Sequence, residues 1–295
     1  MTTDPPRMRT LLTTSLAMVA FAANSVLTRL ALDPPDIDAA SFTGLRLASG
    51  AATLLVVARA RGRRRTPVDR GDWTSAAALF AYAALFSFAY LELPAGTGAL
   101  ILFALVQVTM ITWGIVRGER PRPLQWLGIL LALGGLAYLV SPGMAAPSPF
   151  GTVAMAGAGV AWGVYSLRGR GPGDPVVRTT DNFVRSLPMV AVLGAVALSG
   201  VDLEPRGVLL AIASGAAASG LGYVIWYEAL RDLTATRAAA VQLTVPVIAS
   251  LGGLLFLGEA FTARLAIATA LILGGVGATL SARSRRPVAP GPAKK

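Results

Sequence analysis

The sequence contains no cysteine and no histidine. Disulfide bonds, thiol nucleophiles, histidine metal ligands and Ser-His catalytic relays are therefore excluded. Carboxylates are scarce, with 15 Asp and Glu among 295 residues, and charged residues amount to only 14%, against about 25% in soluble domains. The glycine-rich loop with which P-loop enzymes bind ATP is also absent. From these absences we predict neither an enzyme nor a bound cofactor or metal.

Hydrophobic residues, in contrast, make up 54% of the chain and give it a mean hydropathy of +0.63. They gather in ten runs of about the 17 to 25 residues that cross a bilayer. Backbone polar groups in lipid must bond inside their own segment, so continuous runs of this length predict helices. We therefore predict an all-α polytopic membrane protein with ten transmembrane helices. The predicted spans are Thr10–Ala31, Ala39–Ala58, Trp73–Leu91, Gly96–Val116, Leu124–Val140, Phe150–Leu167, Thr179–Ser199, Gly207–Leu230, Thr236–Leu257 and Phe261–Ser281.

The first run could instead be a secretory signal, because Arg7 and Arg9 precede it. We favour a retained span, since its removal would destroy the repeat described below. Residues 1–9 are predicted to be a cytoplasmic segment. Residues 282–295, which are rich in Pro, Ala and Lys, are predicted to be a disordered cytoplasmic tail.

Much of the chain occurs twice. A shift of 140 residues places Gly258 and Glu259 on Gly118 and Glu119, and it also pairs several small residues upstream. Ten spans in two copies give five helices per copy. Because five is odd, the second copy must enter the membrane from the opposite side, as in transporters built from inverted repeats. The two inverted five-helix repeats are predicted at residues 10–140 and 150–281.

Arginine and lysine are distributed unevenly between the two sides of this arrangement. One side holds both termini and the Arg59–Arg70 loop, whereas the loops of the other side hold only Arg29, Arg206 and Arg264. By the positive-inside rule, both termini are predicted to be cytoplasmic. The net charge of +11 does not indicate nucleic-acid binding, because the cations are spread over short loops and form no single patch. The Arg59–Arg70 loop fits the topology signal, with binding of anionic lipid as the alternative.

A turn at Gly258-Glu259 separates a helix of small residues, which contains Pro246, from a helix that contains Gly274-Gly275. This pattern resembles the EamA-type repeat of the drug/metabolite transporter superfamily. The second copy of the repeat carries the resemblance best.

The resemblance covers the chain from about Thr10 to Ser281, and Trp162-Gly163 resembles the opening of the second repeat. In the first copy, Val106 replaces an expected proline and Ala22 replaces an expected glycine. Within the superfamily, the chain is most similar to the aromatic amino-acid exporters of the YddG type. That resemblance implies an exporter in the bacterial inner membrane, with a central cavity used by alternating access.

Polar and aromatic side chains inside the spans are the candidates for this cavity, because such groups are unfavourable in lipid and face protein or water. Tyr82, Phe86 and Tyr90 recur every four residues, which places three rings on one helix face. Gln242 lies one turn before Pro246, and proline kinks a helix. The predicted substrate-binding residues are Asn24, Arg46, Tyr82, Tyr90, Gln107, Trp162, Tyr165, Arg185, Tyr223, Gln242 and Thr244, with Pro246 as a helix kink.

Each candidate also has a simpler interpretation. The aromatic stripe could serve ordinary helix packing. Asn24 and Gln107 could hydrogen-bond between helices. Arg46 and Arg185 could extend their guanidinium groups to the membrane interface if they lie closer to it than their position in the spans indicates. The sequence leaves these alternatives open.

An amide and aromatic lining disfavours a strongly anionic substrate such as a nucleotide-sugar, although Arg46 and Arg185 could each bind one carboxylate. A zwitterionic amino acid fits both features. Glu92, Glu228 and Glu259 lie at span ends, and the middles of the spans hold no carboxylate other than Asp181, near the start of the seventh, so facilitated diffusion is the simpler prediction. Proton-coupled antiport, or transport of a drug or nucleotide-sugar, are the alternatives. The expected partners are a small-molecule substrate and the lipid bilayer, and the oligomeric state is left open.

Overall fold

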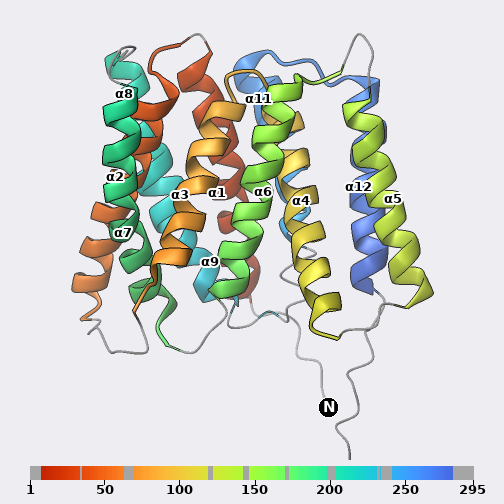
Figure 1. Cartoon of the computed structure of the whole chain (residues 1–295), viewed down its shortest axis with the longest axis horizontal. Coiled ribbons are helices and arrows are strands. Elements are labelled where there is room, and N and C mark those ends of the chain that lie inside the picture. Colours follow the sequence, from red (N-terminus) through yellow and green to blue (C-terminus); the bar gives the residue numbers. More distant parts are fainter. Residues whose placement is uncertain are drawn as a thin grey trace, which may run out of the picture.

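The computed structural model describes residues 8–33, 35–62, 70–118, 122–141, 146–169, 173–197, 203–230, 233 and 241–281. These residues are almost entirely helical (Figure 1). The segments α8, η3 and α9 follow one another without a break, so the described helices form ten rods, in agreement with the ten predicted spans. The elements are α1 (Met8–Leu32), α2 (Ala39–Ala60), α3 (Trp73–Ala89), α4 (Ala95–Val116), α5 (Pro123–Val140), α6 (Pro149–Arg168), α7 (Pro175–Val196), α8 (Pro205–Ala213), η3 (Ser214–Leu221), α9 (Gly222–Leu230), α11 (Thr244–Leu257) and α12 (Ala263–Ser281).

Several helices begin where the sequence supplies a side-chain acceptor for the free amides of the first turn. Asp38 accepts hydrogen bonds from two amides at the start of α2, at 3.0 and 2.9 Å. The helices α3, α6 and α7 are capped in the same way by Asp72, Ser148 and Asp174. A capping aspartate followed by a proline makes α7 begin at Pro175, four residues before its predicted start at Thr179.

Five of the described rods are long and apolar enough to cross a membrane, namely α1, α2, α4, α6 and the rod formed by α8, η3 and α9. The helices α3, α5, α11 and α12 are apolar and shorter. Hydrophobic side chains cover the outside of the bundle, where Val116, Leu255 and Val153 are 75%, 74% and 72% exposed. A hydrophobic surface of this kind indicates a lipid surrounding.

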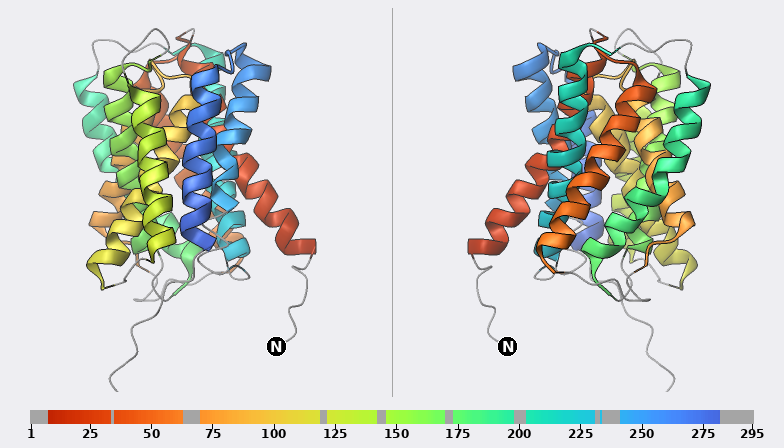
Figure 2. Two further views of the ribbon diagram at one scale, coloured as in Figure 1. Left: turned by 90° about the vertical axis from the view of Figure 1, so that its right-hand side faces the viewer. Right: turned by 90° about the vertical axis from the view of Figure 1, so that its left-hand side faces the viewer.

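The two halves of the chain interleave in the bundle (Figures 1 and 2). The helix α3 packs on α6, α1 packs on the α8–α9 rod, and α2 packs on α7. The helices α4 and α11 pack on each other, while α5 and α12 pack mainly on each other at one side. The first turn of α1 and the last turn of α12 lie at one end of the bundle, which we name the terminal face (Figures 1 and 2). The opposite face carries the turn between α1 and α2.

The repeated Gly-Glu turn has a structural role in the second copy. Gly258 ends α11 in the left-handed region with φ +66°, and its counterpart Gly118 has φ +90°. Both carboxylate oxygens of Glu259 accept the amide of Ala95, each at 2.9 Å. Arg29 lies 3.7 Å from the same carboxylate. Because the N-cap residue of α4 makes no side-chain capping bond, Glu259 serves as the cap of this helix from 164 positions away.

Replacing Glu259 with alanine should lower stability, because the first turn of α4 loses its acceptor. We expect a loss of about 1–2 kcal/mol, measured as a lower midpoint of thermal unfolding of the purified protein in detergent. Glu259→Gln keeps one acceptor oxygen and should lose less. Glu204→Ala is the matched control, because Glu204 is the N-cap residue of α8 and makes no side-chain capping bond. Equal losses in Glu259→Ala and Glu204→Ala would contradict the capping role.

Candidate functional site

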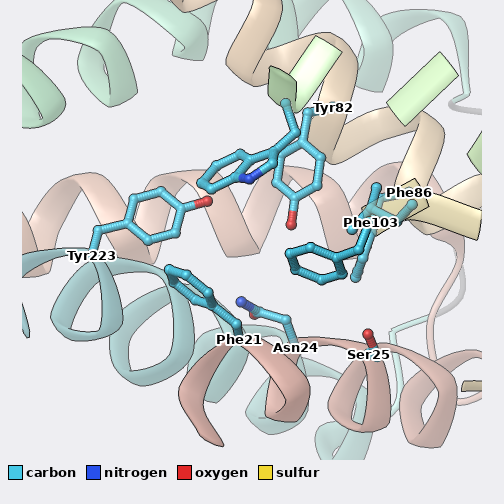
Figure 3. A pocket seen from close by; sticks show the side chains of 9 residues that line it. Phe21, Asn24, Ser25, Tyr82, Phe86, Phe103 and Tyr223 are labelled. Carbon is cyan, nitrogen blue, oxygen red and sulfur yellow. The ribbon is translucent and has the colours of Figure 1, made fainter. Parts of the chain in front are cut away.

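A cavity lies at the centre of the bundle, between α1, α3, α4, α6 and α9 (Figure 3). Every residue in its wall is buried, and even the two most accessible, Phe21 and Trp162, are only 7% exposed. The cavity is therefore closed towards both faces of the bundle. Its wall consists of Phe21, Asn24, Ser25, Tyr82, Phe86, Leu102, Phe103, Trp162 and Tyr223.

Aromatic rings from α1, α3, α6 and α9 form much of this wall. The ring centroid of Trp162 lies 4.9 Å from that of Tyr82, 5.1 Å from that of Tyr223 and 6.2 Å from that of Phe21. These pairs are tilted or edge-on, which are the arrangements that aromatic rings prefer. An apolar or aromatic side chain of a substrate would meet ring faces and edges on several sides.

The predicted stripe of Tyr82, Phe86 and Tyr90 lies on one face of α3. The centroids of successive rings are 5.4 and 4.7 Å apart. Only the first two rings reach the cavity, because Tyr90 lies just beyond the end of α3, where its hydroxyl donates to the carbonyl of Ala95 at 3.2 Å. The stripe therefore serves both the cavity and the packing of helices, which are the two interpretations that the sequence left open.

Arg46 lies directly behind the aromatic wall and is 1% exposed. Its Nη2 donates to the hydroxyl of Tyr82 at 3.0 Å, and its Nε donates to Oγ of Ser219 at 3.2 Å. The guanidinium carbon also lies 4.8 Å from the centroid of the Phe86 ring, a cation–π contact. Arg46 therefore points into the protein and not towards a membrane interface.

The eighth rod contains a π-helical segment, η3. In a π-helix each residue bonds to the fifth along, so residues five apart share a face. Ser214 and Ser219 have this spacing, and both hydroxyls donate to Oδ1 of Asn24, at 2.8 and 3.3 Å. In an α-helix, where neighbours on one face are three or four apart, the two serines would point in different directions. η3 also touches α2, because a Cβ at Gly215 would lie 2.1 Å from the carbonyl oxygen of Arg46.

Polar contacts between helices close the bundle at the terminal face. Arg61 donates to Glu228 at 2.7 Å, and Arg168 donates to Asp72 at 2.9 Å. Partial burial raises the pKa of Asp72, but hydrogen bonds from Ser75 and Arg168 outweigh it and hold this pKa below its ordinary value. We name these two ion pairs the terminal closing contacts.

A second set of contacts closes the opposite face. Arg206 donates to Asp36 at 2.9 Å, and Glu259 joins Arg29 to the start of α4 as described above. Burial raises the pKa of Glu259, although the amide of Ala95 and the charge of Arg29 act the other way. These interactions, which we name the opposite closing contacts, tie the α1–α2 turn and the α11–α12 turn to neighbouring helices.

The structure brings together about half of the predicted substrate-binding residues. Four of them line the cavity, namely Asn24, Tyr82, Trp162 and Tyr223. Arg46 lies behind Tyr82, and Tyr165 packs outside the wall with its ring centroid 5.6 Å from that of Trp162.

Five predicted residues lie away from the cavity wall. Arg185 is 29% exposed and forms an ion pair with Asp181 at 3.4 Å. Its guanidinium group also lies 5.4 Å from the ring centroid of Trp73. The other four are Tyr90, Gln107 and Gln242, which are buried, and Thr244, which is exposed.

The predicted kink at Pro246 takes the form of a break. Residues 241–242 are helical, Leu243 forms a turn, and α11 begins at Thr244. Pro246 has no N–H with which to bond the carbonyl of Gln242, so the helix is interrupted one turn before the proline. Residues 234–240, which belong to the predicted ninth span, lie outside the described residues.

Four residues in or around the cavity are not among the predicted ones, namely Leu102, Phe103, Ser214 and Ser219. Leu102 and Phe103 carry no signal, because residues of this kind fill every span. The two serines lie in a run of Gly, Ala and Ser, and runs of small residues in membrane helices indicate close approach of another backbone. This signal marks the position of η3 but does not specify its wider turn.

Comparison with known proteins identifies the family. The model of the EamA-like transporter family matches residues 8–141 and, a second time, residues 149–281. The chain belongs to the EamA-like transporter family. The predicted resemblance is thus confirmed at this level, and the EamA family comprises transporters, in agreement with the prediction that the chain is not an enzyme.

Individual relatives extend this family assignment. An uncharacterised protein of Pseudomonas aeruginosa is 52% identical over 281 residues, which cover 95% of this chain and 98% of that protein. The threonine/homoserine exporter RhtA of Escherichia coli K12 is 29% identical over 171 residues, or 55% of this chain and 57% of the exporter. A protein of known crystal structure superposes with a TM-score of 0.61 at 23% identity, covering 90% of this chain and 98% of that one. The last comparison supports the fold, whereas the likeness to aromatic amino-acid exporters stays a prediction.

Gly215→Ala should destabilise the protein, because the new Cβ would lie 2.1 Å from the backbone of α2. We expect a loss of about 1–3 kcal/mol, typical of overpacking, measured by thermal unfolding. Gly274→Ala is the matched control, since a Cβ there has no neighbour within 4 Å, and it should leave the unfolding midpoint nearly unchanged. A Gly215→Ala variant as stable as the control would show that η3 does not depend on this contact.

Proposed function

We propose that this EamA-family protein is a secondary exporter of amino acids and related small metabolites in the bacterial inner membrane, and that it works by alternating access around the central cavity. The observation that carries the proposal is the closed cavity itself. Rings and uncharged polar groups line it, and it lies at the centre of a helical bundle. A midplane site between two halves of the chain is the architecture of secondary transporters. Under this proposal, the structure with its buried cavity represents an occluded state of the cycle.

The packing of helices supports two inverted five-helix repeats, at residues 10–140 and 150–281. Exchanging the two halves pairs α1 with α6, α2 with α7, α3 with the α8–α9 rod, α4 with α11 and α5 with α12. Under this exchange the contact of α3 with α6 becomes that of α1 with the α8–α9 rod, and the contact of α4 with α6 becomes that of α11 with α1. Both are present, as expected for a two-fold axis between the halves.

In this proposal, ion pairs at the two faces control from which side of the membrane the cavity is accessible. The Arg61–Glu228, Arg168–Asp72 and Arg206–Asp36 ion pairs are partly exposed to solvent. Exposed ion pairs contribute only about 0–1 kcal/mol each, so these three can break and re-form readily. Breaking only one set would open the cavity towards one side, which is how closing segments gate a site. Because the terminal face carries most of the basic loops, we place it, with both termini, in the cytoplasm.

The wall also indicates the class of substrate. Rings form most of the wall, and Arg46 behind it supplies one nearby positive charge. RhtA, which matches over half of the chain, is a threonine/homoserine exporter. Together these features favour amino acids, aromatic ones included, over nucleotide-sugars, which carry several negative charges. Transport of another metabolite or a drug is the alternative.

Facilitated diffusion is our proposal for energetics, because no carboxylate lines the cavity. Proton-coupled antiport is the second candidate. The observation in its favour is Asp181, a carboxylate that is only 2% exposed and accepts the amide of Gly71 at 3.1 Å.

Transport should be measured in proteoliposomes with labelled phenylalanine, threonine and a nucleotide-sugar, each with and without a pH gradient. Amino-acid flux that ignores the gradient is the expected result. Trp162→Ala should weaken the apparent affinity about tenfold through the lost ring contacts. Trp126→Ala is the matched control, since Trp126 is 48% exposed on the outside of the bundle. Flux of the nucleotide-sugar alone would refute the substrate class, and acceleration by the gradient would favour antiport.

The proposed orientation can be tested by labelling, because the chain has no cysteine of its own. Leu203→Cys places a thiol at an exposed position of the opposite face, and Arg70→Cys places one at the terminal face. In intact cells a membrane-impermeant maleimide should label the first variant, and it should label the second only after permeabilisation. The reverse pattern would invert the orientation.

A further inference from the structure

We infer that Arg46, together with the hydroxyl of Tyr82, forms a subsite for a carboxylate, so that the protein recognises the carboxylate of its substrate and not the ammonium group. This inference rests on the proposed function and names the chemical group that the cavity selects. The substrate class is therefore monocarboxylates with an apolar or aromatic side chain, of which neutral amino acids are one kind.

The burial of Arg46 is the first reason. Its side chain is 1% exposed, and a guanidinium group keeps its charge at any pH that a protein tolerates. Its Nη1 is buried without a hydrogen-bond partner among the described residues. A buried charge of this kind is strongly unfavourable unless an anion or a full set of acceptors accompanies it. The Nη1 group of Arg46 is thus a buried hydrogen-bond donor that no acceptor among the described residues satisfies.

The second reason is that the described residues supply no counter-ion. Their ion pairs use Arg9, Arg29, Arg61, Arg168, Arg185 and Arg206, and none includes Arg46. The hydrogen-bond partners of Arg46 are two neutral hydroxyls, and the rings of Tyr82 and Phe86 add cation–π contacts at 5.2 and 4.8 Å. A bound anion would complete the charge balance.

The cavity wall offers hydrogen-bond donors to such an anion. The hydroxyl of Tyr82 accepts a hydrogen bond from Arg46, which leaves its own proton to be donated into the cavity that it lines. The hydroxyl of Tyr223 also points into the cavity (Figure 3) and has no partner among the described residues. A carboxylate that receives Nη1 of Arg46 and the proton of Tyr82 would therefore be held by a charge-assisted pair of bonds.

The wall contains no carboxylate for the ammonium group of an amino acid. An ammonium group would find only neutral partners in the wall, namely hydroxyl and amide oxygens and aromatic rings, which hold a cation less strongly than an ion pair does. The amino group should consequently be dispensable for binding, whereas the carboxylate should not.

Binding of three matched probes to the purified full-length protein tests this asymmetry. Phenylalanine carries both groups, 3-phenylpropionate carries only the carboxylate, and 2-phenylethylamine carries only the amine. Because a ligand of the folded state raises the midpoint of thermal unfolding, both acids should raise it, with an apparent affinity at least about tenfold above that of the amine. Equal shifts by the acid and the amine would overturn the subsite and leave the proposed function standing. No shift with any probe would overturn both.

Variants separate the role of the charge from that of packing. Arg46→Gln should abolish the preference for the acids, and Arg46→Lys should restore part of it. Arg117→Gln, which removes an exposed arginine that takes no part in the closing contacts, is the matched control and should keep the preference. If Arg46→Gln does not fold, Tyr82→Phe, which removes only a hydroxyl, tests the subsite in its place. This variant should lower the affinity for the acids several-fold and leave the affinity for the amine unchanged. An equal loss of affinity for both would overturn the role of Tyr82 in the subsite.

Discussion

The centre of the molecule depends on the contact between α2 and η3, where the backbone at Gly215 lies against the backbone of Arg46. This contact joins the two halves of the chain. It also brings Ser219 to the guanidinium group of Arg46 and to Asn24 of α1. The wider turn of η3 is what places Ser214 and Ser219 on one face. Without that turn, one of two buried hydroxyls would lack a partner, at a cost of about 1–3 kcal/mol.

The two copies of the repeat contribute to one cavity in different ways. The third rod of the first copy is a regular α-helix that places Tyr82 and Phe86 in the wall. The third rod of the second copy places Tyr223 in the wall, and the serines of its η3 segment hydrogen-bond Asn24. Arg46 and Arg185 likewise lie on the second helix of each copy. One turn before Arg185 stands Asp181, which pairs with it, but one turn before Arg46 stands Phe42. A local counter-ion therefore satisfies Arg185 outside the cavity, whereas Arg46, behind the cavity wall, has no counter-ion among the described residues.

The contacts at the two faces differ in strength from those at the centre. The rings and hydroxyls around the cavity are buried, so each of their interactions is strong and costly to break. The Arg61–Glu228, Arg168–Asp72 and Arg206–Asp36 ion pairs at the faces are partly exposed and individually weak. The proposed alternating access requires such a difference, because the bundle must open at one face while its centre keeps its arrangement.

The sequence by itself determined the number of helices, most of their limits, the family and the stripe on α3. It could do so because a bilayer sets the length of a transmembrane span. The spacing of residues along a helix and the capping residues at its start are also local signals that can be read from the sequence. Only the tertiary structure decided which candidates line the cavity, since the depth and facing of a side chain depend on the helix packed against it. Arg46 and Arg185 both lie on the second helix of their copy, but only the packing of other helices shows that Arg46 is 1% exposed behind the cavity wall. The capping of α4 by Glu259 and the turn of η3 are decided in the same way, by contacts between residues far apart in the chain.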